Sequence, residues 1–572
     1  MDEIFRVILN QHQSDPSEPR AVKPQKPPKS MPVRILISLA VTLVFAAVYF
    51  YISLPALNIH APEFYWFFFL ILAVFSVCMM ILGGFRAASP GEYIGYLRKN
   101  LKIPFFLICL LIAVVVIGSV SGMVIFRTKA YSSLLQLETG NFTEEVAEIN
   151  YNQIPMLDSQ SANNLSNRKL GELSDLVSQF TVNPESAQIN YNDVPVRVSY
   201  LDYDNLFKWL SNRSEGIPAY LYVNMVTQEV TVQRLEEGIK ISPSEYFNRD
   251  LQRYLRFRYP TKMFTDVNFE IDEEGTPYWI GSVTTRTIGL FGGRDVIGAV
   301  LLNAVTGEST YYDIDDVPQW VDRVFLAELV IEQYDYRGRY HNGFFNAIFG
   351  QENCTETTDG YNYIALDDDV WVYTGVTSVS GDLGNIGFIL VNQRTKEGSY
   401  YSCAGAEEYS AMSSAQGAVQ QYDYQATFPL LLNISDQPTY FMALKDAAGL
   451  VKMYAMVNVQ QYQIVATGTS VATCEESYRR LLAESNLIDD SDVSIDSNLN
   501  YQQVDGAIAE IREATMNGNT QYFIRLIGES VYYQISAASA PLTVILNVGD
   551  EVTIEFLSAD GEIIAANAVT RK

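Results

Sequence analysis

Three long apolar stretches near the start of the chain constrain its fold more than any other feature. They cover residues 35–54, 64–85 and 104–126. Each has roughly the 20 residues that a helix needs to cross a hydrocarbon layer. A cleaved signal peptide does not fit, because no small-residue cleavage pattern follows the first stretch and two more stretches come soon after it. The sequence therefore predicts three transmembrane helices.

Basic residues are distributed unevenly around these stretches. The first 34 residues hold six, and the loop between the second and third stretches holds Arg86, Arg98, Lys99 and Lys102, whereas the loop between the first and second holds none. Lys and Arg mark loops that stay in the cytoplasm. We therefore expect a cytoplasmic N-terminus, a three-pass membrane protein and an extracytoplasmic portion covering residues 127–572.

The charge of that outer portion excludes some partners. Residues 128–572 hold 28 basic and 60 acidic side chains, a net charge of −32. Such a surface argues against nucleic acid as a partner. The three apolar stretches contain no charged residue, which argues against ion transport. Gly118 and Gly122 have a spacing that lets two helices approach closely, but anchoring in membrane lipid is the plainer interpretation.

The outer portion repeats one short pattern. The sequences VLLNAVTGESTYY (300–312) and ILVNQRTKEGSYY (389–401) share Asn, Thr, Glu and a Tyr pair, and AYLYVNMVTQEV repeats the first three. The recurring triplets are Asn224, Thr227 and Glu229; Asn303, Thr306 and Glu308; and Asn392, Thr395 and Glu397. Asn tolerates left-handed backbone and Thr bonds the local backbone. Each triplet is therefore predicted at a hairpin end, and ligand binding by the Asn and Glu is the less favoured alternative.

The flanking residues predict a duplicated module. Residues 247–259 have helical periodicity and are followed by four strands, and the next copy follows the same pattern with Trp371 in the place of Trp279. A fourth, fainter copy is expected at 439–458, with its turn at 445–449 and Tyr454 replacing the Tyr pair. Helices are also expected over 131–149 and 170–180, as a stalk or cap.

One of these modules resembles a known family. The segment YWIGSVTTRTIGLFGGRDVIGAVLLNAVTGE within 247–312 is similar to a PepSY module, which implies a cystatin-like fold and the binding or restraint of a partner protein. The peptidase that often accompanies such modules has a zinc-binding His pair, and this chain has no H-E-x-x-H. The strand VGDEVTIEF and the hairpin ADGEIIAANAV near the C-terminus resemble those of an OB or SH3-like barrel.

The predicted fold class is a membrane-anchored α+β protein with three transmembrane helices, tandem helix-plus-antiparallel-sheet modules and a C-terminal small β-barrel. The expected divisions are a Pro/Lys-rich cytoplasmic tail (1–34), the three helices (35–126), a helical stalk or cap (127–190), four α+β modules (191–246, the PepSY-like 247–335, 336–420 and the degenerate 421–488), and an acidic linker with the barrel (489–572).

Residues that could carry catalysis are few. The chain has three His, and only His341 lies in the outer portion, so no multi-His metal site can form there. The acidic runs Asp367 to Asp369 and Asp489 to Asp496 lack the Gly-containing loop of an EF-hand and are expected to be solvated turns. No catalytic, metal-ligating or cofactor-binding residue is predicted. A carboxylate enzyme stays open, because sequence spacing does not reveal which acids meet in space.

Cysteines are sparse outside the predicted helices. Cys354, Cys403 and Cys474 make an odd count, which argues against a disulfide scaffold. Cys354 with Cys403 is the expected pair if one forms. Together these features predict a membrane-anchored, extracytoplasmic binding or scaffold protein of a bacterial cell envelope, with protein partners there and with homo-oligomers left open. The alternatives are an envelope enzyme that uses carboxylates and a structural subunit of an envelope assembly.

Overall fold

The computed structural model describes residues 30–85, 89–148, 154–366, 368–380, 384–489, 502–516, 519–536, 540–556 and 563–572. The expected tail is thus almost entirely outside the described residues, as are Asp367 and residues 490–501 of the acidic linker. The chain divides into two compact units. The helix unit consists of Met1–Tyr131, Ile241–Asp266 and Val283–Ile297, and the sheet unit of Ser132–Lys240, Val267–Ser282 and Gly298–Lys572.

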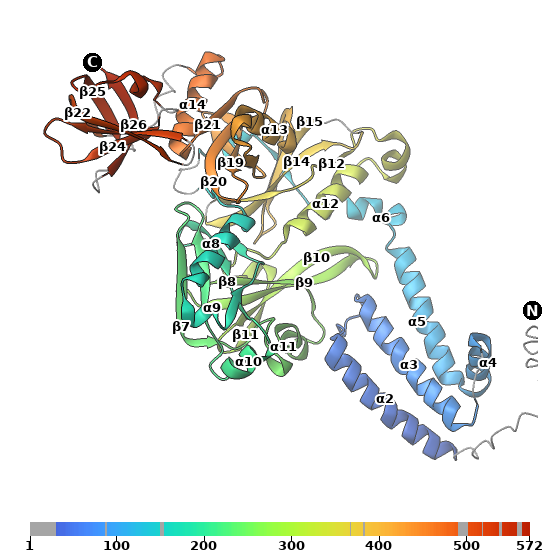
Figure 1. Ribbon diagram of the computed structural model, residues 1–572. Coiled ribbons are helices and arrows are strands. Elements are labelled where there is room, and N and C mark those ends of the chain that lie inside the picture. The colour runs from blue at the N-terminus through green and yellow to red at the C-terminus, as the bar shows by residue number, and fades with distance from the viewer. Residues whose placement is uncertain are drawn as a thin grey trace, which may run out of the picture. The chain divides into compact units, whose positions relative to one another are not determined.

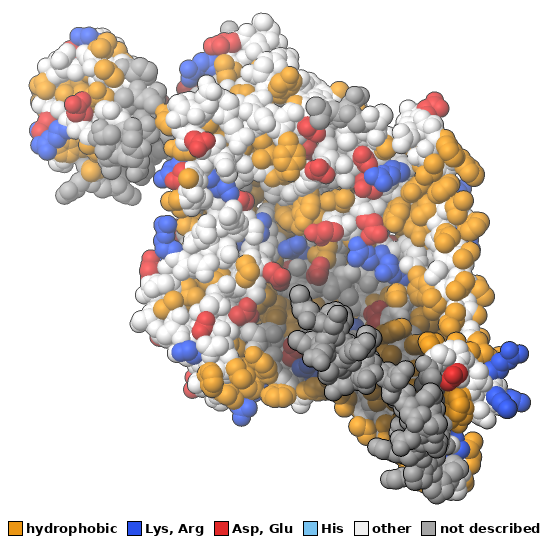
Figure 2. All heavy atoms as spheres, turned by 45° about the vertical axis from the view of Figure 1, so that its right-hand side comes forward, with side chains coloured by type: hydrophobic (Ala, Val, Ile, Leu, Met, Phe, Trp, Pro, Cys, Tyr) orange, Lys and Arg blue, Asp and Glu red, His pale blue; other side chains and the backbone are white. Residues whose placement is uncertain are grey.

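Three helices of the helix unit are long and apolar enough to cross a membrane (Figure 1). They are α2 (Met31–Ser53), α3 (Pro62–Leu82) and α5 (Lys102–Ser121). Hydrophobic side chains cover much of their surface (Figure 2), and only 11% of the most apolar window of α2 and of α5 is buried. An apolar surrounding is therefore needed to cover them. The prediction of three helices of membrane-spanning length and composition is confirmed.

The helices are joined differently at their two ends. At one end, Arg34 of α2 donates from Nη2 to the Met79 carbonyl of α3 (2.9 Å) and to the hydroxyl of Tyr96 (3.2 Å), which lies on helix α4 (Pro90–Asn100). Ser89 caps α4 by accepting a bond from the Glu92 amide. Among the described residues, this end therefore contains Arg34, Arg98 and Lys99, three of the basic residues that predict a cytoplasmic side.

At the other end, the α2–α3 loop contacts later parts of the chain within the same unit. The Leu57 amide donates to the Pro260 carbonyl (2.7 Å), just after helix α11 (Leu251–Arg258). His60 Nδ1 lies 2.9 Å from the Leu290 carbonyl oxygen. The loop without basic residues and the segments around 260 and 290 thus share one end of the helices. Which end faces the cytoplasm stays a prediction.

Gly118 and Gly122 of the third apolar stretch receive a hairpin loop of the same unit. A Cβ built on Gly118 would lie 2.5 Å from the Leu290 side chain, and one built on Gly289 would lie 2.9 Å from the Gly122 Cα. The Gly122 carbonyl accepts a bond from the Tyr131 hydroxyl at 2.7 Å. The two glycines therefore have a partner within the chain, which accounts for their small size without a second membrane helix.

Four antiparallel meanders of four strands each form most of the sheets. Sheet A contains β3 (Ala187–Tyr191), β4 (Val194–Ser199), β6 (Ile217–Asn224) and β7 (Val230–Ile239). Sheet B contains β8 (Met263–Ile271), β9 (Pro277–Ile288), β10 (Gly292–Asn303) and β11 (Ser309–Asp313). Sheet C contains β13 (Asn362–Leu366), β14 (Asp369–Ser378), β15 (Gly384–Asn392) and β16 (Gly398–Ala406). Sheet D contains β18 (Leu430–Ile434), β19 (Gln437–Lys445), β20 (Val451–Asn458) and β21 (Val465–Gly468).

A helix precedes each meander in the chain. These helices are α8 (Ser159–Gly171), α11, α12 (Ala327–Tyr340) and α13 (Glu408–Ala418), and α14 (Val471–Glu484) follows the last sheet. The short strands β12 (Thr355–Thr357) and β17 (Gln425–Ala426) add to sheets C and D. The helix and the strands predicted for the second copy, and the strands predicted for the third, are confirmed.

The recurring Asn makes the same turn between the third and fourth strands of sheets A, B and C. The Oδ1 atoms of Asn224, Asn303 and Asn392 each accept bonds from the amides two and three residues later, at 2.8–3.0 Å. The amide of each Asn also donates to the carbonyl of the Glu five residues later, at 2.8–2.9 Å. The prediction that all three triplets lie at hairpin ends is confirmed.

Sheet D has a fourth turn of this kind, but it lies elsewhere than expected. Asn458 Oδ1 accepts bonds from the Gln460 and Gln461 amides at 3.1 and 2.8 Å, and the Asn458 amide donates to the Ile464 carbonyl. Residues 445–449 instead connect β19 to β20, one hairpin earlier. The expected turn was wrong because this copy keeps only the Asn and its turn is one residue longer, which hides the pattern.

A second recurring bond fixes the register of all four copies. The residue after each Asn donates from its amide to a carbonyl on the second strand at 2.9–3.0 Å; the pairs are Met225 with Pro195, Ala304 with Pro277, Gln393 with Val370, and Val459 with Pro438. Trp279 therefore corresponds to Val372, and both are 1% exposed. The expected equivalence of Trp279 with Trp371 is wrong by one residue, which places Trp371 on the opposite face of its strand.

The sheets associate in two equivalent pairs. At the end of sheet A, the Lys240 amide donates to the Ala304 carbonyl of sheet B at 3.0 Å. At the end of sheet C, the Ala406 amide donates to the Val459 carbonyl of sheet D at 2.9 Å. Buried aromatic residues fill both pairs: Tyr200, Tyr220, Phe269 and Trp279 in A and B, and Tyr373, Phe388, Tyr440 and Phe441 in C and D.

The segment expected to form a helical stalk contains strands as well as helices. Residues 131–149 contain β1 (Glu138–Gly140) and a single helical turn, α7 (Phe142–Glu145). β1 pairs in parallel with β16 of sheet C. The predicted helix was wrong here because pairing with a distant strand outweighed local periodicity. Strand β2 (Phe180–Val182) and β3 also begin before residue 191.

Five strands at the C-terminus form a closed ring of pairings. They are β22 (Gln502–Met516), β23 (Asn519–Leu526), β24 (Tyr532–Ser536), β25 (Glu551–Phe556) and β26 (Ile563–Arg571). The order around the ring is β22-β23-β24-β26-β25, and only the β24–β26 pairing is parallel. Ile508, Ile524, Val552 and Ile554 are fully buried inside it.

Candidate functional site

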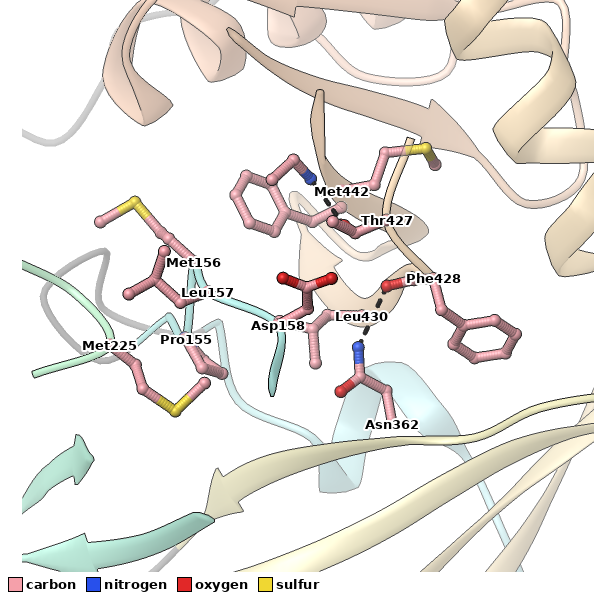
Figure 3. A pocket seen from close by; sticks show the side chains of 12 residues that line it. Pro155, Met156, Leu157, Asp158, Met225, Asn362, Thr427, Phe428, Leu430 and Met442 are labelled. Atoms are coloured by element: carbon pink, nitrogen blue, oxygen red, sulfur yellow. Dashed lines mark hydrogen bonds between the residues drawn. The ribbon is translucent and has the colours of Figure 1, made fainter. Parts of the chain in front are cut away.

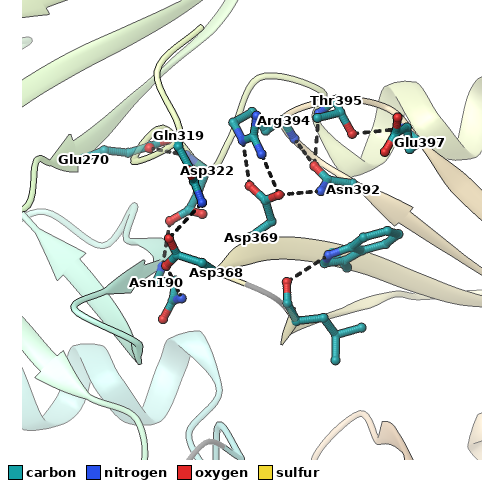
Figure 4. Close-up of polar contacts among 12 residues, drawn as sticks. Asn190, Glu270, Gln319, Asp322, Asp368, Asp369, Asn392, Arg394, Thr395 and Glu397 are labelled. Carbon is teal, nitrogen blue, oxygen red and sulfur yellow. Dashed lines mark hydrogen bonds and ion pairs between the residues drawn. The ribbon is translucent and has the colours of Figure 1, made fainter. Parts of the chain in front are cut away.

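Three acidic side chains, two of them fully buried, come together where sheets A, B and C meet (Figure 4). Glu270 comes from β8, Asp322 from the segment between β11 and α12, and Asp368 from the turn before β14. Asn190 of β3 completes the group. No local pattern brings these residues together, because Asn190 and Asp368 are 178 positions apart.

Backbone and side-chain bonds link the four residues in a chain. The Asn190 amide donates to Asp322 Oδ2 at 2.6 Å, and the Asp322 amide donates to Glu270 Oε2 at 3.0 Å. Asn190 Nδ2 then donates to Asp368 Oδ1 at 2.8 Å. Gln319 Nε2 donates to the second oxygen of Asp368 at 3.2 Å (Figure 4). Three sheets are thus joined through one set of carboxyl groups, which we call the acidic junction.

Burial dominates the electrostatics of the acidic junction. Glu270 is 0% exposed and Asp322 is 1% exposed. Burial raises the pKa of Glu270, while the Asp322 amide and Arg323 act against that rise. The pKa of Asp322 is raised well above its ordinary value by burial and by the negative charge of Glu270. Both groups are therefore protonated more easily than solvated carboxyl groups, because it is unfavourable to bury two negative charges beside each other.

Asp369, beside the acidic junction, has a full set of partners. Arg394 donates to its two oxygens from Nε and Nη2, both at 2.7 Å, and Asn392 Nδ2 donates to Oδ2 at 2.8 Å. This two-pronged ion pair holds the third repeat turn against β14. Asn392 thereby uses both ends of its side chain within the protein, so its structural contacts account for the repeat Asn at this turn.

The contacts of the acidic junction are structural ones within the protein. Neither Glu270 nor Asp322 is reachable from solvent, so a substrate cannot contact them directly. Within the described residues, no three His, Cys, Asp or Glu side chains are placed to hold a metal ion. Sequence reasoning missed Glu270 and Asp322 because each stands beside apolar residues in an otherwise polar stretch, Glu270 between Phe269 and Ile271 and Asp322 between Val321 and Arg323. This pattern is more typical of a solvent-facing position.

A small cavity lies between sheets C and D and the segment before α8 (Figure 3). Its volume is about 30 Å³, room for a water molecule but not for an organic ligand. The lining includes Asp158, which pairs with Lys445 at 2.6 Å. A wider surface depression of about 450 Å³ is lined by Glu407, Tyr409, Ser410, Ser413, Ser414 and Tyr462.

The other residues considered from the sequence are dispersed. His341 is the C-cap of α12, is exposed, and has Nδ1 3.0 Å from the Gly338 carbonyl oxygen. Cys354, Cys403 and Cys474 are all free and buried, so the expected pairing of Cys354 with Cys403 is absent. Burial raises the pKa of the Cys403 thiol to about 11, which keeps it protonated and unreactive.

The structure thus brings together Glu270, Asp322 and Asp368, which are distant in the sequence. It leaves Cys354 and Cys403 unbonded, although the sequence left their pairing open. Comparison of the sequence with protein-family models and with curated proteins found no match.

Proposed function

We propose that this chain is a membrane-anchored, extracytoplasmic binding or scaffold protein of the cell envelope, which contacts protein partners through its sheet modules. The three apolar helices support attachment to a membrane. The unequal distribution of Lys and Arg supports a cytoplasmic N-terminus and an outward-facing sheet unit.

The observation that carries the proposal is the fusion of repeated modules into one body by buried polar bonds. Sheet A joins sheet C through Asn190 and Asp368, and the Tyr373 hydroxyl of sheet C donates to the Pro429 carbonyl at the start of sheet D at 2.8 Å. Such bonds fix the modules relative to one another. Arrays of repeated modules present extended surfaces, which suit recognition of another protein better than a reaction at one point.

Two resemblances point the same way. The PepSY-like segment of the second module implies binding or restraint of a partner protein. The C-terminal strand order, with its parallel pairing between the third and fifth strands, supports an OB-like barrel. We propose that this barrel contacts protein and not nucleic acid, because residues 128–572 have a net charge of −32.

A carboxylate enzyme that used the acidic junction would require the junction to open. Its two central acids are 0% and 1% exposed, and their hydrogen bonds join three sheets. Opening would therefore break contacts on which the sheet unit depends. Binding through the surface requires no such change and is the function that the geometry supports best.

Cross-linking in intact cells tests the proposal. The full chain is purified after treatment with a membrane-impermeant amine cross-linker, and in parallel with a permeant one. We expect the impermeant reagent to capture a protein partner in stoichiometric amount. A partner captured only by the permeant reagent would place recognition on the cytoplasmic side and contradict the proposal, as would the absence of any stoichiometric partner.

A further inference from the structure

Helix α12 is followed by an aromatic segment whose side chains are exposed and are not packed into the cores of the sheet modules. Residues 343–350, GFFNAIFG, turn back through a π-helical stretch (Asn346–Gly350). Three of its side chains are largely open to solvent: Phe345 is 68% exposed, Ile348 52% and Phe349 81%. We call residues 343–350 the aromatic finger. Leaving these side chains in water is unfavourable unless another apolar surface covers them.

Several polar atoms of the finger form hydrogen bonds within it or with Glu352 just after it. Asn346 Nδ2 donates to the Glu352 carbonyl at 2.9 Å, and the Glu352 amide donates back to Asn346 Oδ1 at 3.2 Å. The Ala347 amide donates to the Gly343 carbonyl. The rings of Phe345 and Phe349 stack with centroids 6.5 Å apart. The finger is therefore an ordered element that turns its backbone inward and its apolar side chains outward.

Only a short stretch of chain separates the third apolar helix from the segment that contacts α12. Arg337 of α12 donates from Nη1 to the Leu135 carbonyl (3.1 Å) and from Nη2 to the Leu137 carbonyl (3.3 Å). Leu135 follows the last residue of α5, Ser121, by only 14 residues. Eight of those residues form helix α6 (Val124–Tyr131), which is kinked at Arg127 and covers about 12 Å at 1.5 Å per helical residue. The finger is thus held on a short tether from the point where the chain leaves the third apolar helix.

We propose that the aromatic finger inserts into the interfacial layer of the same membrane that α2, α3 and α5 cross. The inference rests on the proposed membrane attachment. Phe and other apolar side chains on an element with satisfied backbone groups partition into this layer. Residues 336–350 contain no Asp or Glu, within a region whose net charge is otherwise strongly negative, so lipid phosphate does not repel them.

An environment-sensitive dye on single introduced thiols tests the insertion. In the full chain carrying Cys78→Ser and Cys109→Ser, the three remaining cysteines are buried. Phe349→Cys, Phe207→Cys and Ile112→Cys are each labelled and placed in phosphatidylcholine vesicles, with or without lipids carrying nitroxides near the head group and along the acyl chain. Phe207, on α10 (Leu206–Asn212), is a matched control because its ring is similarly exposed, at 76%. Ile112 reports on α5 itself.

We expect the dye at position 349 to shift to shorter wavelength and to lose most of its emission to the nitroxide lipids, whereas the dye at position 207 keeps its emission. Quenching at position 112 but not at position 349 would overturn the insertion alone. No quenching at position 112 would overturn the membrane attachment and the insertion with it. Equal quenching at positions 349 and 207 would show unspecific contact with the membrane and contradict the proposal. A wavelength shift at position 349 without quenching, which disappears on dilution into more lipid, would show that the finger binds a second copy of this chain, and this too would contradict the proposal.

Discussion

Phe325 and Gln393 are hydrogen-bonded to each other in both directions. The Phe325 amide donates to the Gln393 backbone carbonyl at 2.7 Å, and Gln393 Nε2 donates to the Phe325 carbonyl at 2.9 Å. Gln393 directly follows the repeat residue Asn392 and is 0% exposed. The pair ties the segment that leaves sheet B to the repeat turn of sheet C, so the repeated hairpins also serve as joints between modules.

Replacing Gln393 by Leu keeps the side-chain volume and leaves the Phe325 carbonyl without its side-chain donor. A buried polar group without a partner costs about 1–3 kcal/mol. We expect urea unfolding in detergent, followed by tryptophan fluorescence, to show a free energy of unfolding lower by about that amount. The exposed Gln463→Leu is the control and should change it by less than about 0.5 kcal/mol. Equal urea midpoints for Gln393→Leu and Gln463→Leu would show that the hydrogen bond between Gln393 and Phe325 does not contribute to stability.

The acidic junction predicts a pH dependence of stability. Burial raises the pKa of Glu270 and of Asp322 above the ordinary values of 4.5 and 3.8. The folded protein therefore binds more protons than the unfolded chain between those values and the raised ones. The contribution of these groups to stability is fully present below the ordinary pKa values and is lost as pH rises through the raised ones.

The variant Glu270→Gln removes one of the two titrating groups and keeps an oxygen that can accept the Asp322 amide. We expect its melting temperature to fall less between pH 5 and pH 8 than that of the unchanged protein. The exposed Glu229→Gln should retain the full fall. Parallel curves for Glu270→Gln and the unchanged protein would contradict the assignment.

Local patterns predicted the features that local chemistry determines. The apolar runs predicted the three long helices, and the Asn at 224, 303 and 392 predicted the hairpins, because each Oδ1 bonds amides two and three residues away. The fourth hairpin was predicted at the wrong place because only the Asn of the triplet, Asn458, is retained there. The acidic junction could not be predicted, since Glu270 lies between Phe269 and Ile271 as a solvent-facing residue of a half-buried strand would, and yet all three are buried in the folded chain.

The repeat turns should differ in their tolerance of Asn→Asp. An Asp at position 303 still offers an oxygen to the Val305 and Thr306 amides. At position 392 the same change replaces the Nδ2 donor to Asp369 by a second negative charge in a residue that is only 3% exposed. We expect Asn392→Asp to lower the free energy of unfolding by about 1–3 kcal/mol, and Asn303→Asp to lower it much less. Equal losses in the two variants would show that the bond to Asp369 is unimportant.

Gly118 should be coupled energetically to Leu290. A Cβ at Gly118 would lie 2.5 Å from the Leu290 side chain, so Gly118→Ala should lower the melting temperature and Leu290→Ala should partly restore it. We expect a coupling energy of about 0.5–3 kcal/mol in the double-mutant cycle. If Gly118 instead mediated association between copies, Gly118→Ala would change the oligomeric mass, and Leu290→Ala would not rescue it.

The orientation of the chain is the prediction with the widest consequence. Because Arg34 and the α4 basic residues Arg98 and Lys99 lie at the end of the helices opposite the α2–α3 loop, the Lys and Arg rule assigns that end to the cytoplasm. With an epitope tag at each terminus, protease added to intact protoplasts should remove the C-terminal tag and the chain after about Lys129, while the N-terminal tag survives. After permeabilisation with detergent both tags should be lost. Loss of the N-terminal tag from intact protoplasts, with survival of the sheet unit, would reverse the orientation and with it the extracytoplasmic function proposed above.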